Sequence, residues 1–161
     1  MEKDIRQSIT DYKMPRYICE ILCNHYAKAF LDMTIICEND TYIFSYDKKN
    51  KRRLVYRELT EIDKLQLVLT LIMINDNNCQ MLIGAERYLI EPELIYSVRN
   101  RTDYNSIGIL FYPDTTMTPF NIKLIRFMDK IGTKNKKKAI NCFELIKDEL
   151  AKNEIYRAKS I

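Results

Sequence analysis

The sequence predicts an α+β fold, and three observations support this prediction. Two β-branched and aromatic runs lie between residues 31 and 46, on either side of an Asn-Asp pair. A long apolar segment with helical spacing begins at Thr60. Further short strands and then two amphipathic helices follow it. The layout is therefore a β-rich first half, a central helix, a small β-hairpin and a helical end, which favours the α+β class.

The size and charge of the chain limit its function classes. A chain of 161 residues that is 47% hydrophobic can form one core or two small sub-lobes. Only 3 glycines and 4 prolines are present, so long flexible linkers are not expected. The net charge of +4, from 26 basic and 22 acidic residues, is too small for a dedicated nucleic-acid-binding protein.

The first half of the chain is predicted to be rich in strands. The Asn39-Asp40 pair tolerates positive φ and indicates a hairpin turn. The predicted elements are a strand at Ile5–Thr10, a helix at Pro15–Phe30, strands at Leu31–Cys37 and Thr41–Tyr46, a basic segment at Lys48–Arg53, and a short helix at Leu54–Leu59.

The clearest predicted helix runs from Thr60 to Asp76. Thr60 and Asp63 match a capping box, in which a hydroxyl and a carboxylate satisfy each other's backbone N–H groups. One apolar face contains Ile62, Leu65, Val68, Leu69 and Ile72. The other apolar residues are Leu67, Leu71 and Ile74. A helix that is apolar on more than one side is expected at the centre of the core.

Three strands are predicted next, at Arg87–Ile90, Leu94–Val98 and Ile107–Tyr112. Pro92 cannot donate to a strand ladder and favours a loop between the first two strands. The polar segment Arg99–Ser106 is expected to be an exposed turn.

Two helices are predicted to close the chain. Thr118 is expected to cap the first one, with Pro119 at its first position, a buried stripe of Phe120, Leu124, Phe127, Met128 and Ile131, and an end at Gly132. After Thr133–Lys138 the second helix is expected to continue to about Asn153. Ala139, Ile140, Phe143, Ile146 and Leu150 are its expected buried residues.

The cysteines do not indicate a disulfide framework or a zinc site. Their number is odd, and only Cys19 and Cys23 are close in sequence. His25 follows them, but no second ligand pair has zinc-like spacing. We therefore expect core thiols and a structural histidine.

No segment of the sequence indicates secretion or membrane insertion. The N-terminus lacks an apolar core, and the longest apolar run, Leu65–Ile74, is shorter than the ~20 residues that span a bilayer. The expected location is the cytoplasm, with membrane association through segments outside this chain left open.

Four strings along the chain resemble a known family. They are Tyr46-Asp47, Thr60-Glu61, YLIEPELIY at residues 88–96 and ILFYP at residues 109–113. They resemble the kinase-like domain found upstream of forkhead-associated (FHA) domains in Firmicutes. They are also similar to the pseudokinase-like cytoplasmic domain of the type VII secretion subunit EssB/YukC. The resemblance extends over most of the chain from about Pro15, and LIEPELIY and FYP are its most specific strings.

The resemblance implies one kinase-like domain over residues 1–161, in a reduced form of the protein-kinase fold. Residues from about 1 to 58 would form a small β-rich N-lobe, and residues from about 59 to 161 a short helical C-lobe. Relatives carry a transmembrane segment or an FHA domain after this region. The implied partners are other protein subunits.

The residues that a kinase needs for phosphoryl transfer are missing. The three glycines, Gly84, Gly108 and Gly132, cannot form a glycine-rich loop. Leu89–Pro92, including Glu91 and Pro92, stands at the H-R-D position. Phe111, Tyr112 and Pro113 stand at the D-F-G position, and the Asp114 that follows lacks the loop glycine.

We therefore expect no enzymatic activity and no cofactor. Lys48 and Lys49 lie in a polar turn and not in an apolar strand, so they do not replace the kinase lysine. Glu91 and Glu93 are the only acids beside the would-be catalytic loop. Such a pair could hold a metal or act as a base, but stabilisation of the loop around Pro92 is the favoured interpretation.

Two basic clusters are candidate contacts for an anion or for lipid headgroups. The first contains Lys51, Arg52 and Arg53, and the second contains Lys134, Lys136, Lys137 and Lys138. Lysines at a helix N-terminus oppose the macrodipole, so the second cluster does not stabilise its helix.

Four tyrosines could stack on bases, namely Tyr88, Tyr96, Tyr104 and Tyr112. Tyr88, Tyr96 and Tyr112 are instead expected in the core. This expectation disfavours nucleic-acid binding.

The sequence thus predicts a catalytically inactive, kinase-like interaction or scaffold domain in a bacterial membrane-associated assembly. Type VII secretion and FHA-linked signalling are the two contexts that the resemblance implies. A small basic domain that binds nucleic acid or another polyanion is the alternative. The identity of the partner, the binding face and the oligomeric state are open.

Overall fold

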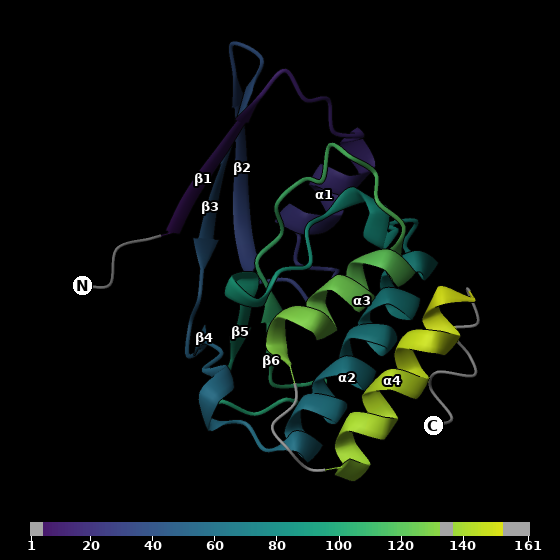
Figure 1. Cartoon of the computed structure of the whole chain (residues 1–161). Coiled ribbons are helices and arrows are strands. Elements are labelled where there is room, and N and C mark those ends of the chain that lie inside the picture. Colours follow the sequence, from purple (N-terminus) through teal and green to yellow (C-terminus); the bar gives the residue numbers. More distant parts are fainter. Residues whose placement is uncertain (1–4, 133–136, 153–161) are drawn as a thin grey trace.

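The computed structural model describes residues 5–132 and 137–152, with side chains from Cys142 onward in the second range. Over these residues the fold is α+β, as predicted (Figure 1). The helices are α1 Arg16–Cys23, α2 Glu61–Gln80, α3 Phe120–Ile131 and α4 Lys137–Ala151. The strands are β1 Ile5–Thr10, β2 Asp32–Glu38, β3 Thr41–Asp47, β4 Arg52–Arg53, β5 Ile95–Ser97 and β6 Ile107–Ile109. Short 3₁₀ helices cover Tyr56–Glu58, Ala85–Arg87 and Pro92–Leu94.

The first sheet is antiparallel, with the order β1-β3-β2. Strands β2 and β3 form the predicted hairpin, in which Asp32 pairs with Asp47 and Glu38 pairs with Thr41. Asn39 and Asp40 have φ values of 49° and 61°, so the turn uses the left-handed conformation that these residue types tolerate. The predicted strand β1 is also confirmed, on the opposite side of β3 from β2.

The second sheet is antiparallel as well, with the order β4-β5-β6, and its strands are shorter than predicted. The strand predicted at Arg87–Ile90 is wrong. Residues Ala85–Arg87 form a 3₁₀ helix, and Tyr88 makes an isolated bridge to Pro113. The ladder does not extend here because proline has no N–H to donate. The segment Arg99–Ser106 is only partly exposed, since Thr102 and Ser106 are buried.

Helix α1 ends at Cys23, whereas the sequence predicts a helix as far as Phe30. His25 has a φ of 58°, and the N–H groups of His25 and Tyr26 donate to the carbonyls of Leu22 and Ile21. This is the Schellman arrangement that closes a helix C-terminus. A glycine usually takes the left-handed position, and a histidine there gives no stop signal in the sequence.

Helix α2 begins with the predicted capping box. The Thr60 hydroxyl accepts from the Asp63 N–H at 3.1 Å, and the Asp63 carboxylate accepts from the Thr60 N–H at 2.9 Å. The predicted face is partly wrong, because Ile62 is 77% exposed and Leu69 is 41% exposed. The buried face also contains polar side chains, including Lys64, Asn75 and Asn78, which a count of apolar residues misses.

Helices α2, α3 and α4 lie side by side in Figure 1. Gly132 ends α3 with a φ of 60°, as predicted. Thr118 is not the cap: Pro119 precedes the helix without a side-chain hydrogen bond, and the Thr118 hydroxyl bonds to Thr116. Ile131 is only half-buried.

In α4, Phe143, Ile146 and Leu150 are buried as predicted, whereas the side chains of Ala139 and Ile140 are outside the described set.

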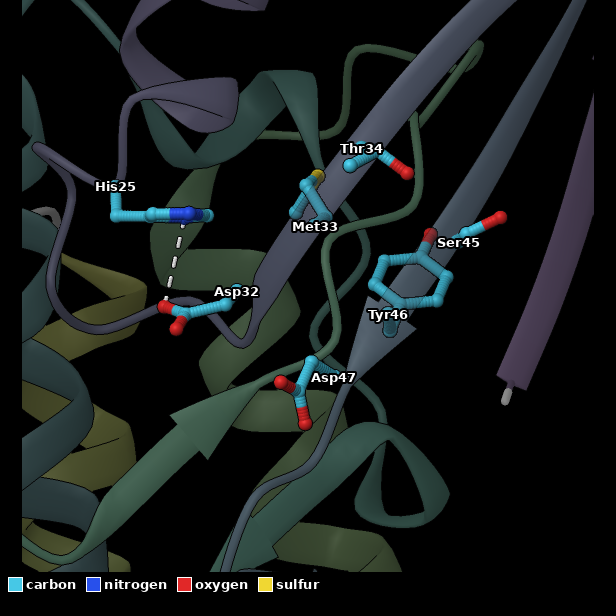
Figure 2. Close-up of a pocket in the computed structure, with 7 residues that line it drawn as sticks. All are labelled: His25, Asp32, Met33, Thr34, Ser45, Tyr46 and Asp47. Carbon is cyan, nitrogen blue, oxygen red and sulfur yellow. Dashed lines mark ion pairs between the residues drawn. The ribbon is translucent and has the colours of Figure 1, made fainter. Parts of the chain in front are cut away.

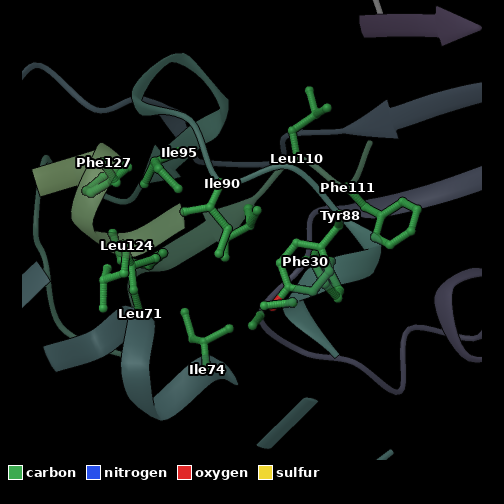
Figure 3. Close-up of a cluster of buried hydrophobic side chains, with 14 of the residues drawn as sticks. Phe30, Leu71, Ile74, Tyr88, Ile90, Ile95, Leu110, Phe111, Leu124 and Phe127 are labelled. Carbon is green, nitrogen blue, oxygen red and sulfur yellow. The ribbon is translucent and has the colours of Figure 1, made fainter. Parts of the chain in front are cut away.

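An aromatic cluster connects the two sheets and the central helix (Figure 3). The ring of Phe30 makes edge contacts with Tyr88 and Phe111, at centroid distances of 4.9 and 5.3 Å. Leu71 and Ile74 of α2 and Leu124 and Phe127 of α3 belong to the same core. No helix in the described part of the chain is long and apolar enough to cross a membrane.

Candidate functional site

The two segments that the sequence resemblance assigned to kinase catalytic-loop and metal-loop positions lie side by side. The Leu89 N–H donates to the Tyr112 carbonyl, and the Asp114 N–H donates to the Arg87 carbonyl, both at 2.9 Å. A cavity of about 220 Å³ lies beside them, which we call the loop cavity. Its lining residues are Leu89, Ile90, Glu91, Asp114, Thr116, Thr118, Lys123 and Arg126.

A buried ion pair forms one wall of the loop cavity. The Lys123 Nζ of α3 lies 2.6 Å from the Asp114 carboxylate, and both residues are buried. The same ammonium donates to the carbonyls of Ala85 at 2.6 Å and Tyr88 at 2.5 Å. Asp114 also accepts from the Thr116 N–H and hydroxyl. All these polar groups therefore satisfy one another within the protein.

The electrostatics of this pair follow from burial and hydrogen bonding. Burial raises the pKa of Asp114, but the hydrogen bonds from Lys123 and Thr116 outweigh it, so the pKa falls below 3.8. Burial lowers the pKa of Lys123 below 10.5, against the opposing effect of Asp114. The carboxylate stays ionised at neutral pH and is fully engaged, so it is a poor base and a poor metal ligand.

Glu91 and Pro92 each contact a neighbouring element. The Glu91 carboxylate forms an ion pair with Lys130 of α3. The Pro92 carbonyl accepts a hydrogen bond of 2.8 Å from the Tyr56 hydroxyl, so the loop is held from the other side as well. Glu93 is exposed and does not line the loop cavity. The two glutamates are therefore not brought together as a pair.

Phe111, Tyr112 and Pro113 contribute to packing and not to the cavity. Phe111 is buried in the aromatic cluster, and its carbonyl accepts from the Tyr46 hydroxyl. Pro113 is buried at the bridge to Tyr88. Tyr112 is half-buried, not largely in the core as predicted, because its hydroxyl reaches the Ser8 carbonyl of β1 at 2.9 Å. Tyr88 and Tyr96 are buried as predicted.

The first basic cluster is divided by the structure. Arg52 and Arg53 of β4 line a second cavity, of about 460 Å³, which we call the arginine cavity. The other lining residues are Asn50, Val55, Glu58, Ser97, Arg99 and Asn100. Lys51 lies elsewhere, with its aliphatic stem against Gly108 of β6, where a β-carbon would be only 2.8 Å from the Lys51 Cδ.

The side chains of the second basic cluster lie outside the described set. Lys134 and Lys136 lie outside the described residues. Lys137 and Lys138 begin α4, and their side chains are outside the described set.

A third cavity, of about 310 Å³, lies near the start of β2 and the end of β3 (Figure 2). Nδ1 of His25 is 3.5 Å from an Asp32 carboxylate oxygen, and Lys49 pairs with the other oxygen. Burial raises the pKa of Asp32. The hydrogen bond from Lys49 and the electrostatic effect of His25 outweigh burial, so the pKa falls below 3.8. His25 thus has an acidic partner seven residues away, which its sequence spacing does not indicate.

Within residues 5–132 and 137–152, no three His, Cys, Asp or Glu side chains are grouped so that they could hold a metal ion. No family model matches the chain. No curated protein matches it either.

Sequence analysis missed Lys123, Arg99 and Asn100 as residues that shape these cavities, and it named Asp114 without its partner Lys123. Lys123 has one available signal: it lies three residues after Phe120 and four before Phe127, within the buried stripe of α3. A lysine in that stripe requires a buried partner. Asp114, Arg99 and Asn100 have no comparable signal, because their roles depend on which segments the fold brings together.

Proposed function

We propose that the chain is a catalytically inactive, kinase-like domain that binds other protein subunits as an interaction or scaffold module. Its context would be a bacterial membrane-associated assembly, in type VII secretion or FHA-linked signalling. The sequence resemblance supports the membrane-associated context, and the residues at the loop cavity support the absence of catalytic activity.

The Lys123–Asp114 ion pair is the observation that supports this proposal most. A kinase needs an ionised acid that is free to hold Mg²⁺ and a cation that is free to contact phosphate. Here the acid and the cation neutralise each other, and the ammonium also holds the Ala85 and Tyr88 carbonyls. These two buried charges thus hold the loops together and are not available to Mg²⁺ or phosphate.

A thermal-shift titration with ATP and Mg²⁺ tests the inactive part of the proposal. A ligand that binds the native state raises its Tm, and we expect no change in Tm at millimolar nucleotide. A clear, saturable rise in Tm that Asp114→Asn abolishes would contradict it. The test of the context is the reading frame after Ile161: a transmembrane helix would support secretion, and an FHA domain would support signalling.

The arginine cavity favours polyanion binding as the second candidate function. Nucleic acid contacts many phosphates along a path, so its affinity falls steeply as salt rises. The three arginines that line this cavity would supply cations for such phosphate contacts. A steep salt dependence of binding to single- or double-stranded oligonucleotides would establish this second candidate over the first.

A further inference from the structure

We propose that the arginine cavity binds the phosphate group of a phosphorylated side chain in a partner protein. The proposal rests on the proposed protein-interaction function and gives that function a recognition chemistry. Its basis is the placement of Arg52, Arg53 and Arg99 around one cavity. Arginine clusters recognise phosphate because a planar guanidinium donates two parallel hydrogen bonds to phosphate oxygens.

The fold brings these arginines together from two separate segments. Arg52 pairs with Ser97 across β4 and β5, and Arg99 follows Ser97 by two residues. The Nε of Arg53 donates to the Tyr96 hydroxyl at 3.3 Å, which fixes the direction of its guanidinium. The guanidinium groups of Arg52 and Arg99 make no ion pair or hydrogen bond with any other described residue. Their donors are therefore available to a ligand.

The wall of the cavity is held in a defined conformation. Asn100 accepts from the Val55 N–H at 2.8 Å and donates to the Val55 carbonyl at 3.1 Å, so it ties the turn after β5 to the chain after β4. The turn is closed by a hydrogen bond of 3.1 Å from the Arg101 N–H to the Val98 carbonyl. The backbone that carries Arg99 is thus held in place before a ligand arrives, which reduces the backbone entropy lost on binding.

Arg99 is in a conformation that its own side chain disfavours. Its φ is 53° and that of Asn100 is 59°. Asparagine and glycine tolerate this region, whereas arginine is uncommon in it. Lys49, Leu82 and Met117 take the same conformation outside the cavity, so the φ of Arg99 supports a binding site only together with its place in the cavity lining. Strained backbone of this kind is concentrated at binding sites.

The charge and shape of the cavity favour a single phosphate over a membrane. Three arginines line it against one carboxylate, that of Glu58. A volume of about 460 Å³ is within the range of small-ligand sites. Basic side chains that bind a lipid surface are spread over a flat face of a protein. The three arginines here line a cavity instead. A phosphomonoester carries close to two negative charges at pH 7, which fits such a hollow.

Matched random-sequence peptide libraries test the proposal. Each would carry a central phosphoserine, phosphothreonine or phosphotyrosine, and a second set would carry the same residues unphosphorylated. The best binder would then be measured by calorimetry. We expect the phosphorylated form to bind at least about tenfold more tightly than the unphosphorylated form. Because the second pKa of the phosphate is about 6, affinity should also be higher at pH 7.5 than at pH 5.

Two cavity variants and a control locate the site. Arg52→Gln should weaken binding about tenfold or more. Arg99→Gly should do the same while leaving Tm unchanged or raising it, because glycine relieves the left-handed conformation. This combination excludes unfolding as the cause of the loss. Arg6→Gln, on exposed β1, removes the same charge from another surface and should change Kd by less than about twofold.

The contrary outcomes separate the two proposals. Equal binding of phosphorylated and unphosphorylated peptides would overturn the phosphate site and keep the protein-interaction function. A loss with Arg6→Gln as large as that with Arg52→Gln would also overturn the site, since it shows diffuse charge attraction. Binding to phosphatidylserine vesicles without any phosphopeptide binding would overturn it in favour of a membrane. Failure of the catalytically inactive part of the proposed function would instead appear as the saturable Tm rise with ATP and Mg²⁺.

Discussion

The loop cavity and the arginine cavity use charge in opposite ways. In the loop cavity, Asp114 and Lys123 are buried, paired and hydrogen-bonded to the backbone. In the arginine cavity, Arg52 and Arg99 are exposed and have no partner among the described residues. Buried charges must be satisfied internally, whereas exposed charges can remain available to a ligand. The difference indicates that the first cavity holds the fold together and the second is the better binding site.

The largest expected effect comes from breaking the buried pair. Asp114→Ala should lower the free energy of unfolding by about 3–5 kcal/mol, because the Lys123 ammonium is left buried without a counter-charge. Urea denaturation measures the loss. The double variant Asp114→Leu with Lys123→Met should recover much of it, since an apolar pair leaves no uncompensated charge. A loss below about 1 kcal/mol in the single variant would mean that this cavity does not depend on the pair.

Acidification should weaken the same pair more gently. The folded-state pKa of Asp114 lies below its ordinary value of 3.8. The stabilising contribution is therefore complete above about pH 4 and is lost as pH falls through the folded-state pKa. Unfolding measured from pH 6 to pH 2 should show this loss, and Asp114→Asn should show a smaller dependence on pH. Identical pH dependences of unfolding for the wild type and Asp114→Asn would show that Asp114 does not cause the loss of stability at low pH.

Asn100 is the structural part of the arginine cavity. Asn100→Ala should lower the free energy of unfolding by about 2 kcal/mol, because two hydrogen bonds to Val55 and a residue tolerant of positive φ are both lost. Asn100→Gly keeps the backbone conformation and should lose only about half as much. Equal losses in the two variants would show that the φ preference does not matter at this turn.

The Lys130–Glu91 pair at the rim of the loop cavity should contribute little. The Lys130 side chain is 51% exposed and that of Glu91 is 30% exposed, so solvent screens the pair. Lys130→Ala should change the free energy of unfolding by about 0.5 kcal/mol, and less in 1 M salt. A loss comparable with that of Asp114→Ala would erase the contrast between buried and exposed pairs.

The smallest expected effect is that of Arg52→Gln on stability. Arg52 is exposed and unpartnered, so the free energy of unfolding should stay within about 0.5 kcal/mol of the wild type. Denaturant unfolding checks this expectation. A loss above about 1.5 kcal/mol would assign Arg52 a structural role and weaken the case for a binding cavity.

Local signals in the sequence predicted the fold well where they determine the backbone directly. Thr60 and Asp63 satisfy each other's N–H groups, so the start of α2 could be identified from four residues. Asn39 and Asp40 specified the hairpin, and Gly132 specified the end of α3. Each of these signals acts within a few residues and needs no tertiary information.

The remaining errors arise where tertiary context overrides the local pattern. His25 closes α1 in a left-handed conformation that its residue type does not indicate. The predicted helix therefore extends past the real end of α1. Tyr88 was expected in a strand, but its partner in the bridge is Pro113, which cannot extend a ladder. The sequence grouped Arg52 and Arg53 with Lys51 and not with Arg99. Arg99 joins the cavity only through the pairing of β4 with β5, and the sequence does not reveal that register.

Strand β1 covers one edge of strand β3. It pairs along the whole of β3, from Ile5 opposite Tyr46 to Thr10 opposite Thr41. Without β1, the backbone donors and acceptors of Thr41–Asp47 would form an open sheet edge rich in aromatic side chains. Such an edge pairs readily with an identical strand from a second molecule. Expression tags and proteolytic trimming near the N-terminus should therefore be designed around Ile5, because removal of β1 would expose this edge of β3.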